Sequence, residues 1–96
     1  MRFHPDVQRD INRAMAYYGA ISESLADEFW TEVSEAFRRI ERNPRGHHFD
    51  SEGLRRFNLE RFPFNVLYLE KPDRIRVQVV RHNSRHPTYG RKRRKE

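Results

Sequence analysis

The sequence predicts a small α+β domain in which an N-terminal hairpin of two antiparallel helices packs on a twisted antiparallel sheet. Up to residue 40, apolar residues recur at steps of three and four, which is helical spacing. Beyond residue 53 they alternate in short runs, which is typical of strands. A chain of 96 residues forms one domain with a thin core, because so short a chain buries little surface.

The first helix is predicted over residues 6–18, with Pro5 suited to its entrance. Gly19 and Ser22 interrupt the apolar pattern, and Ser22 is suited to cap a second helix. That helix ends before Pro44, because proline cannot continue the hydrogen-bond ladder. Its apolar stripe, which should be buried against the sheet, comprises Leu25, Phe29, Val33, Phe37 and Ile40.

Three strands are predicted over residues 54–59, 64–69 and 75–80, after a polar loop over residues 47–53. The last two should form an antiparallel hairpin, because residues 71–74 (Lys-Pro-Asp-Arg) are typical of a turn. Residues 1–4 are suited to an edge strand.

Both faces of the predicted sheet carry apolar side chains, so both should be covered. One face meets the helices, and a partner helix or strand should cover the other. Strict alternation from Val77 through Val79 puts Arg81 on the helix side and His82 on the opposite side.

Basic charge is concentrated at the C-terminal end of the chain. Residues 74–96 carry nine Lys/Arg against one acidic residue, a net charge of +8, whereas residues 1–73 carry eleven against thirteen, a net charge of −2. Residues 1–90 are therefore interpreted as one domain and residues 91–96 as a basic tail. Such a tail favours phosphate or an acidic partner.

The sequence contains neither cysteine nor a long apolar run. There is no cysteine, which excludes disulfides and thiolate metal sites. No apolar run has the length of a signal peptide or a membrane span, so we expect a cytoplasmic protein without membrane contact.

Several motifs together resemble the RelE/ParE superfamily of bacterial type II toxins. Residues 53–68 read GLRRFNLERFPFNVLY, and Val80-Arg81-His82 is followed by Arg85, Pro87 and Arg91. The Tyr17-Tyr18 pair and the Asn43-Pro44 helix stop add to the resemblance. It implies the helix-hairpin-and-sheet fold, growth inhibition, and neutralisation by a cognate antitoxin protein.

Two branches of this superfamily act differently. RelE-like members cut mRNA in the ribosomal A site, whereas ParE-like members poison DNA gyrase. The tyrosine pair, the long second helix and the Arg55-Arg56 to Phe62-Pro63-Phe64 string are more similar to ParE.

RNA cleavage would need a base, an acid and cations that stabilise charge on phosphorus. The candidate catalytic residues, for a RelE-type activity only, are Arg61, Arg81, His82, Arg85 and Tyr89, with His86 as a further proton-transfer group. The alternative for each is a structural or binding role, because a segment rich in Arg and His supplies such groups by chance.

The candidate binding residues are Arg55, Arg56, Arg91, Lys92 and Arg93. Arg55 and Arg56 could instead fix a strand edge through ion pairs, and residues 91–95 could be a solvated tail. His47, His48, Asp50 and Glu52 make a poor metal set, so we predict no metal and no small-molecule cofactor.

Three hypotheses therefore stand. The first is a ParE-like toxin that inhibits DNA gyrase and is held by an antitoxin. The second is a RelE-like ribosome-dependent mRNA endonuclease. The third is a non-toxic basic nucleic-acid-binding module, which the absence of a stacking or recognition-helix motif disfavours.

Overall fold

The computed structural model describes residues 1–49 and 53–93. Its helices are α1 (Asp6–Ile21), α2 (Glu23–Arg42) and the short 3₁₀ turn η1 (Pro44–Gly46). Its strands are β1 (Arg2–Phe3), β2 (His48–Phe49), β3 (Arg55–Asn58), β4 (Phe64–Glu70) and β5 (Ile75–His82). Within the described residues, neither helix is long and apolar enough to cross a bilayer.

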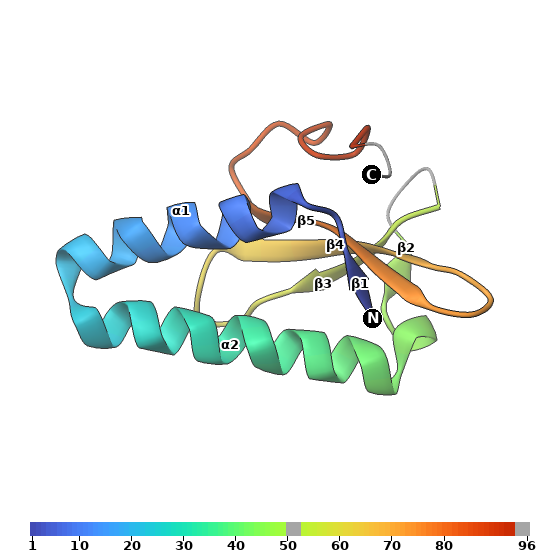
Figure 1. The fold of residues 1–96 in the computed structure, drawn as a ribbon, viewed down its shortest axis with the longest axis horizontal. Coiled ribbons are helices and arrows are strands. Elements are labelled where there is room, and N and C mark those ends of the chain that lie inside the picture. Colours follow the sequence, from blue (N-terminus) through green and yellow to red (C-terminus); the bar gives the residue numbers. More distant parts are fainter. Residues whose placement is uncertain (50–52, 94–96) are drawn as a thin grey trace.

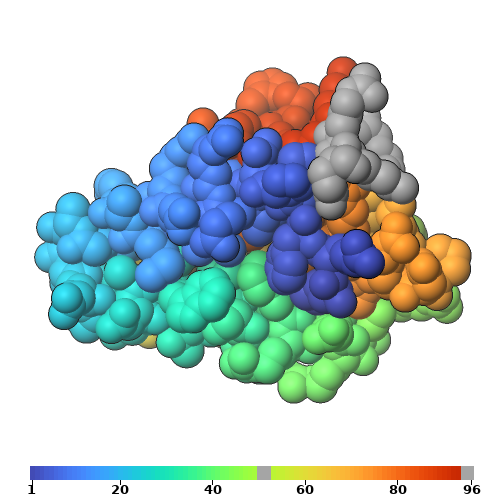
Figure 2. All heavy atoms as spheres, viewed as in Figure 1, coloured from blue at the N-terminus to red at the C-terminus, as the bar shows by residue number. Residues whose placement is uncertain are grey.

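The two helices form the predicted antiparallel hairpin, joined by a single residue (Figure 1). Ser22 is that residue, and its Oγ accepts a hydrogen bond from the Leu25 amide at 3.2 Å, as an N-cap does. Gly19 does not end α1, which continues to Ile21. The two helices form a continuous surface over the left part of the face seen in Figure 2.

The sheet has the order β1-β5-β4-β3-β2. Neighbouring strands are antiparallel except β1, which pairs parallel with β5, so the sheet is mixed rather than wholly antiparallel. The predicted edge strand and the β4–β5 hairpin are confirmed. β2 lies within the segment predicted as a polar loop, where it pairs with the start of β3.

A bulge in β5 reverses the predicted facing of the residues after it. Leu67 pairs with Val79 but Tyr68 pairs with Val77, so Gln78 is an extra residue. Beyond it Val80, not Val79, packs on the helix side, while Val79 packs on the opposite side. The prediction for Arg81 and His82 was therefore wrong, because one extra residue shifts every later side chain to the other face.

The main core lies between the helices and the sheet. Phe29, Val33 and Ile40 of α2 are completely buried, together with Val66, Tyr68 and Val77 of the sheet. Phe37 is only half-buried, at the rim, where its ring meets Phe3 edge to face at 5.1 Å. The stripe of α2 is thus confirmed, with Phe37 as its least buried aromatic member.

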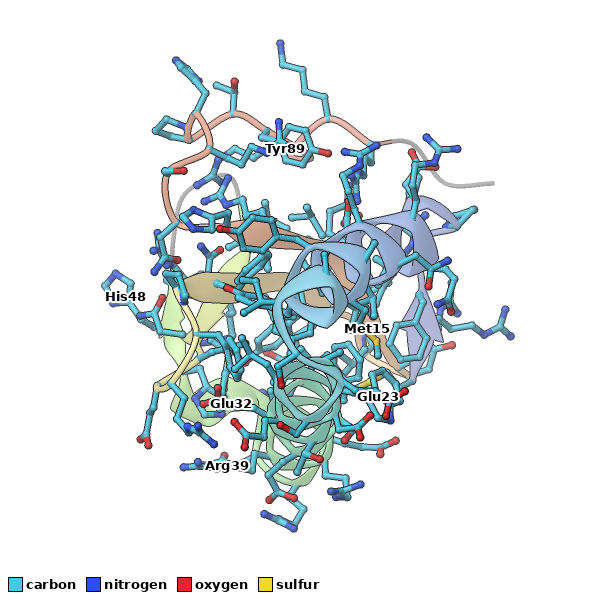
Figure 3. The ribbon with its side chains drawn as sticks, turned by 90° about the vertical axis from the view of Figure 1, so that its left-hand side faces the viewer. Met15, Glu23, Glu32, Arg39, His48 and Tyr89 are labelled. Carbon is cyan, nitrogen blue, oxygen red and sulfur yellow. The ribbon has the colours of Figure 1, made fainter. Side chains whose placement is uncertain are left out.

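The C-terminal segment (residues 83–93) covers part of the other sheet face. Tyr89 packs against the small cluster of Leu54, Leu67 and Val79. Gly90 has a φ of 78°, and a Cβ there would lie 2.6 Å from a Val79 methyl, so only glycine allows this approach. In Figure 3 the segment with Tyr89 lies above the sheet and α2 with Arg39 below it. The chain itself therefore provides some of the cover that was predicted from a partner.

Tyr68 connects the sheet to the end of α2. Its side chain is completely buried, and its hydroxyl donates to the Pro44 carbonyl at 2.6 Å. Burial raises the pKa of Tyr68 to about 12. The neutral hydroxyl is therefore part of the folded structure well into the alkaline range.

The depth of burial along the α2 stripe predicts the cost of truncation. Phe29→Ala should lower the free energy of unfolding by about 3–5 kcal/mol, because it empties a fully enclosed site. Phe37→Ala should cost about 1–2 kcal/mol, because solvent already reaches part of this ring. Urea denaturation of both variants measures the difference, and equal losses would contradict this placement of the core.

The raised pKa of Tyr68 predicts a loss of stability at alkaline pH. The unfolded state loses its phenolic proton near pH 10 and the folded state near pH 12, so the stabilisation is present below about pH 10 and disappears by about pH 12. In Tyr68→Phe, the free energy of unfolding should fall with pH by less than in the unmodified chain, and the difference should be on the order of 2 kcal/mol. The exposed control, Tyr17→Phe, should keep the decline of the unmodified chain when both are unfolded between about pH 9 and about pH 11. An unchanged decline in Tyr68→Phe would refute the assignment.

Candidate functional site

A groove of about 540 Å³ runs between α1 and the C-terminal segment. We refer to it as the α1 groove. Its apolar lining includes the buried residues Tyr18, Phe64 and Val80, which also belong to the main core. Its remaining lining residues are Asp10, Arg13, Ala14, Tyr17, Ile21, Pro63, Arg81, His82, Ser84, Arg85 and Tyr89.

One carboxylate fixes both walls of this groove. Asp10 of α1 accepts two hydrogen bonds from the Arg93 guanidinium, at 2.7 and 2.8 Å, and one from the Val80 amide at 3.0 Å. Its carboxylate side chain is 3% exposed. Burial lowers the pKa of Arg93, but the contacts with Asp10, together with the smaller effects of Tyr89 and Asp6, raise it more, so the net shift is upward. We refer to this contact as the Asp10–Arg93 pair.

The buried side chain of Arg81 binds the backbone of the C-terminal segment. Its guanidinium donates to the carbonyls of Pro87 and Tyr89, at 2.7 and 3.2 Å, and to Asn65 Oδ1 at 3.1 Å. The residue is 4% exposed. The guanidinium therefore binds oxygens of its own chain, and in these contacts Arg81 stabilises the wall of the α1 groove.

The exposed cations of the groove come from two elements. Arg13 lies on α1, and Arg85 lies on the C-terminal segment. The Arg85 guanidinium stacks on the Tyr89 ring at 4.6 Å, and the Tyr89 hydroxyl lies 3.5 Å from both Arg13 and Arg93. The groove thus combines an apolar floor with a cationic rim.

The two candidate histidines are both engaged in local turns. His82 packs its ring against Phe64 at 5.1 Å, and its Nδ1 lies 2.8 Å from the Ser84 hydroxyl. His86 is exposed, and its Nδ1 contacts the hydroxyl of Thr88 at 2.9 Å. Only His82 lines the α1 groove.

Arg61 does not join the other candidate catalytic residues. It lines a separate groove of about 730 Å³ between α2 and β3, and donates to Glu28 at 2.8 Å. The Glu32 carboxylate accepts hydrogen bonds from the backbone amides of Glu60 and Arg61 and so fixes the loop between β3 and β4. The structure therefore brings together Arg81, His82, Arg85 and Tyr89, but places Arg61 elsewhere.

Arg55 and Arg56 stabilise the edge of the sheet. Arg55 donates to the His47 carbonyl at 2.9 Å, lies 3.6 Å from Glu70, and stacks on Phe49 at 4.1 Å. Arg56 donates to Asn58 at 2.8 Å and lines the groove beside α2. A binding role for either residue remains a prediction.

The predicted basic tail is partly folded onto the domain. Arg93 forms the Asp10–Arg93 pair, and Arg91 donates to the Pro87 carbonyl at 2.6 Å. Lys92 is exposed. Residues 94–96, and the Asp50 and Glu52 carboxylates weighed as metal ligands, lie outside the described residues.

Two residues that hold the C-terminal segment and its anchor Arg81 in place escaped sequence analysis. Asp10 lies between Val7 and Ile11 on the buried face of α1, so a carboxylate within an apolar stripe was the available signal. Asn65 is a single polar residue between Phe64 and Val66 in β4, and its Oδ1 accepts a hydrogen bond from Arg81. Its role could not be recognised, because its partner is 16 residues away.

The helix hairpin on a mixed sheet, closed by a basic C-terminal segment, agrees with the fold that the sequence resemblance implies. A family model described as the ParE toxin of the type II toxin–antitoxin system parDE matches residues 1–87, so the chain belongs to the ParE toxin family.

A solved structure described as the chromosomal ParDE toxin–antitoxin system from P. aeruginosa is similar in fold, with a TM-score of 0.75. It is 18% identical, and the match covers 84% of this chain and 91% of that chain. At this identity the likeness establishes the fold. Comparison with curated proteins finds no match by sequence.

The Asp10–Arg93 pair predicts a large asymmetry between two acidic residues of α1. Asp10→Ala should lower the free energy of unfolding by about 3 kcal/mol, because it leaves a largely buried guanidinium without its carboxylate. Asp6→Ala should cost at most about 1 kcal/mol, because Asp6 is more exposed and lies 4.0 Å from Arg93.

Urea denaturation gives both values, and amide exchange at Val80 reports the lost hydrogen bond directly. Exchange at Val80 should accelerate in Asp10→Ala and remain unchanged in Asp6→Ala. Similar losses of stability in the two variants would contradict the role given to Asp10.

Proposed function

We propose that this ParE-family toxin stops growth by binding DNA gyrase, and that a cognate antitoxin holds it inactive. The observation that carries the choice of gyrase is the burial of Arg81. Its guanidinium is directed to carbonyls of its own C-terminal segment. The proposed action lies in the cytoplasm, where gyrase and ribosomes both occur.

An mRNA nuclease would need its cations to face the scissile phosphate. Arg81 faces inward, and Arg61 is paired with Glu28 in a different groove. His82, Arg85 and Tyr89 do share the α1 groove, and they are the residues on which a RelE-type activity would depend. The separation of Arg61 from this set favours interference by binding over cleavage.

The proposed antitoxin follows from the family, whose description names a type II toxin–antitoxin system. The chain also exposes large apolar side chains outside its core, including Tyr17 at 66% and Ile21 at 63%. Neighbouring exposed apolar side chains mark interaction surfaces in small soluble domains. Co-expression with the product of the adjacent gene should therefore restore growth.

The two targets can be separated with purified components. The chain is mixed with gyrase and plasmid in one reaction and with programmed ribosomes in another. We expect trapped, cleaved plasmid DNA in the first and intact mRNA in the second. Cuts at codon positions with unaffected gyrase would overturn the proposal.

Substitutions in the α1 groove sharpen this test. For a nuclease, His82→Ala and Tyr89→Phe should each lower the cleavage rate by about 10²-fold or more, because each removes a proton-transfer group. For a gyrase inhibitor, the same changes should alter only the concentration needed for inhibition. Arg38→Ala, on the exposed face of α2, is the matched surface control in both reactions.

A further inference from the structure

One face of α2 exposes aromatic side chains at regular spacing. Trp30 and Phe37 are two turns apart, and Ser34 lies between them on the same face of the helix. Trp30 is 45% exposed, and Phe3 of β1, which packs on Phe37, is 42% exposed. Exposed tryptophan and phenylalanine side chains in one row are typical of a protein interface. We refer to Trp30, Ser34 and Phe37 as the α2 seam.

The α2 seam faces away from the α1 groove. Glu23 lies on the face of the seam, because it precedes Trp30 by two turns. Figure 3 shows Glu23 and Met15 of α1 on the same side of the helix hairpin, with Glu32 on the other side of α2. Tyr17 lines the α1 groove and follows Met15 by two residues, so it lies on the opposite flank of α1. A partner on the α2 seam therefore leaves the α1 groove open.

The charge of α2 changes sign along the helix. Residues 23–35 contain five carboxylates and no Lys or Arg, whereas residues 36–42 contain three arginines and one carboxylate. This order complements the helix dipole, and it also makes α2 complementary to an antiparallel copy of itself. In that arrangement the acidic half of each helix lies against the basic half of the other.

A single register satisfies two charge pairs at once. Asp27 and Arg38 are placed symmetrically about the midpoint between residues 32 and 33, and so are Glu23 and Arg42. A twofold axis through this midpoint sets Asp27 of each copy opposite Arg38 of the other. The same axis sets Glu23 opposite Arg42. The charges therefore select one antiparallel alignment of the two helices.

These charged groups are accessible to a second copy. The side chains of Arg38 and Arg42 are 60% and 68% exposed. Glu35 accepts hydrogen bonds from Nε and Nη2 of Arg38, at 3.1 and 2.9 Å, which leaves Nη1 without an acceptor among the described residues. Neither Asp27 nor Glu23 forms an ion pair with any residue that the structure describes.

We propose that the α2 seam is a self-association surface, through which two copies of this chain form a symmetric dimer with antiparallel α2 helices. Trp30 of each copy packs beside Ser34 of the other, whose small side chain leaves room for the indole ring. Asp27 pairs with Arg38 across the twofold axis. Because this interface lies away from the α1 groove, the inference is independent of the proposed action on gyrase.

Sedimentation velocity of the purified full chain, over a series of micromolar concentrations, measures this association directly. We expect a monomer–dimer equilibrium that weakens at high salt, because ions screen the charge pairs at its edge. Trp30→Ala should weaken it by about 30-fold or more, because a symmetric dimer loses the side chain twice. Tyr17→Ala removes an exposed tyrosine from the other flank of α1, and should associate within about threefold of the unmodified chain.

A charge exchange tests the register of the two helices. Asp27→Arg and Arg38→Asp should each weaken the dimer by about tenfold or more, because like charges then meet across the axis. A mixture of the two variants should form a heterodimer within about threefold of the original affinity, since both opposite-charge pairs are restored in it. Asp73→Arg and Arg74→Asp, in the turn between β4 and β5, are the matched controls and should associate normally.

Three results would overturn the inference. They are an unmodified chain that stays monomeric at every concentration, normal dimerisation of Trp30→Ala, and charge variants whose mixture associates no better than either one alone. Protection of the α2 seam by the antitoxin or by gyrase, in a chain that is monomeric by itself, would assign the surface to that partner instead. Failure of the unmodified chain to inhibit gyrase would refute the proposed function and leave the dimer standing.

Discussion

The carboxylate of Asp10 holds three parts of the chain together. It lies on α1 and accepts a hydrogen bond from the Val80 amide, just after the bulge in β5. It also binds the Arg93 guanidinium of the C-terminal segment. A carboxylate removed from water needs such partners, because an unpaired buried charge costs several kcal/mol. Here the three hydrogen bonds set the position of the segment that covers the second sheet face. The shape of the α1 groove therefore depends on a single acidic side chain within an otherwise apolar helix stripe.

The same contacts explain why this surface is suited to binding. Arg81 and Arg93 are both directed inward, to carbonyls and to Asp10, so they order the C-terminal segment. Arg13 and Arg85 remain exposed beside Tyr17 and Ile21. A domain with a thin core gains stability from a partner that covers such a surface, since binding to the folded state alone shifts the folding equilibrium.

Much of the fold was predictable because it depends on local spacing. The stripe of Phe29, Val33 and Ile40 and the cap at Ser22 are encoded by neighbours in sequence. The bulge at Gln78 was not predictable, since the adjacent Val79 and Val80 are equally apolar and either could face the helices. The candidate site was only partly predictable. Arg93 stands in a run of basic residues typical of a solvated tail, and its partner, Asp10, is 83 residues away.

The central claim is that the carboxylate of Asp10 holds the C-terminal segment against α1 and β5. Hydrogen–deuterium exchange of the unmodified chain and of Asp10→Asn tests it most directly, because this substitution keeps the size of the side chain and removes its charge. The account predicts faster exchange in Asp10→Asn at the amides of Tyr89 and Arg91, which donate within the C-terminal segment, with little change along α2. Unchanged exchange at these two amides would contradict it.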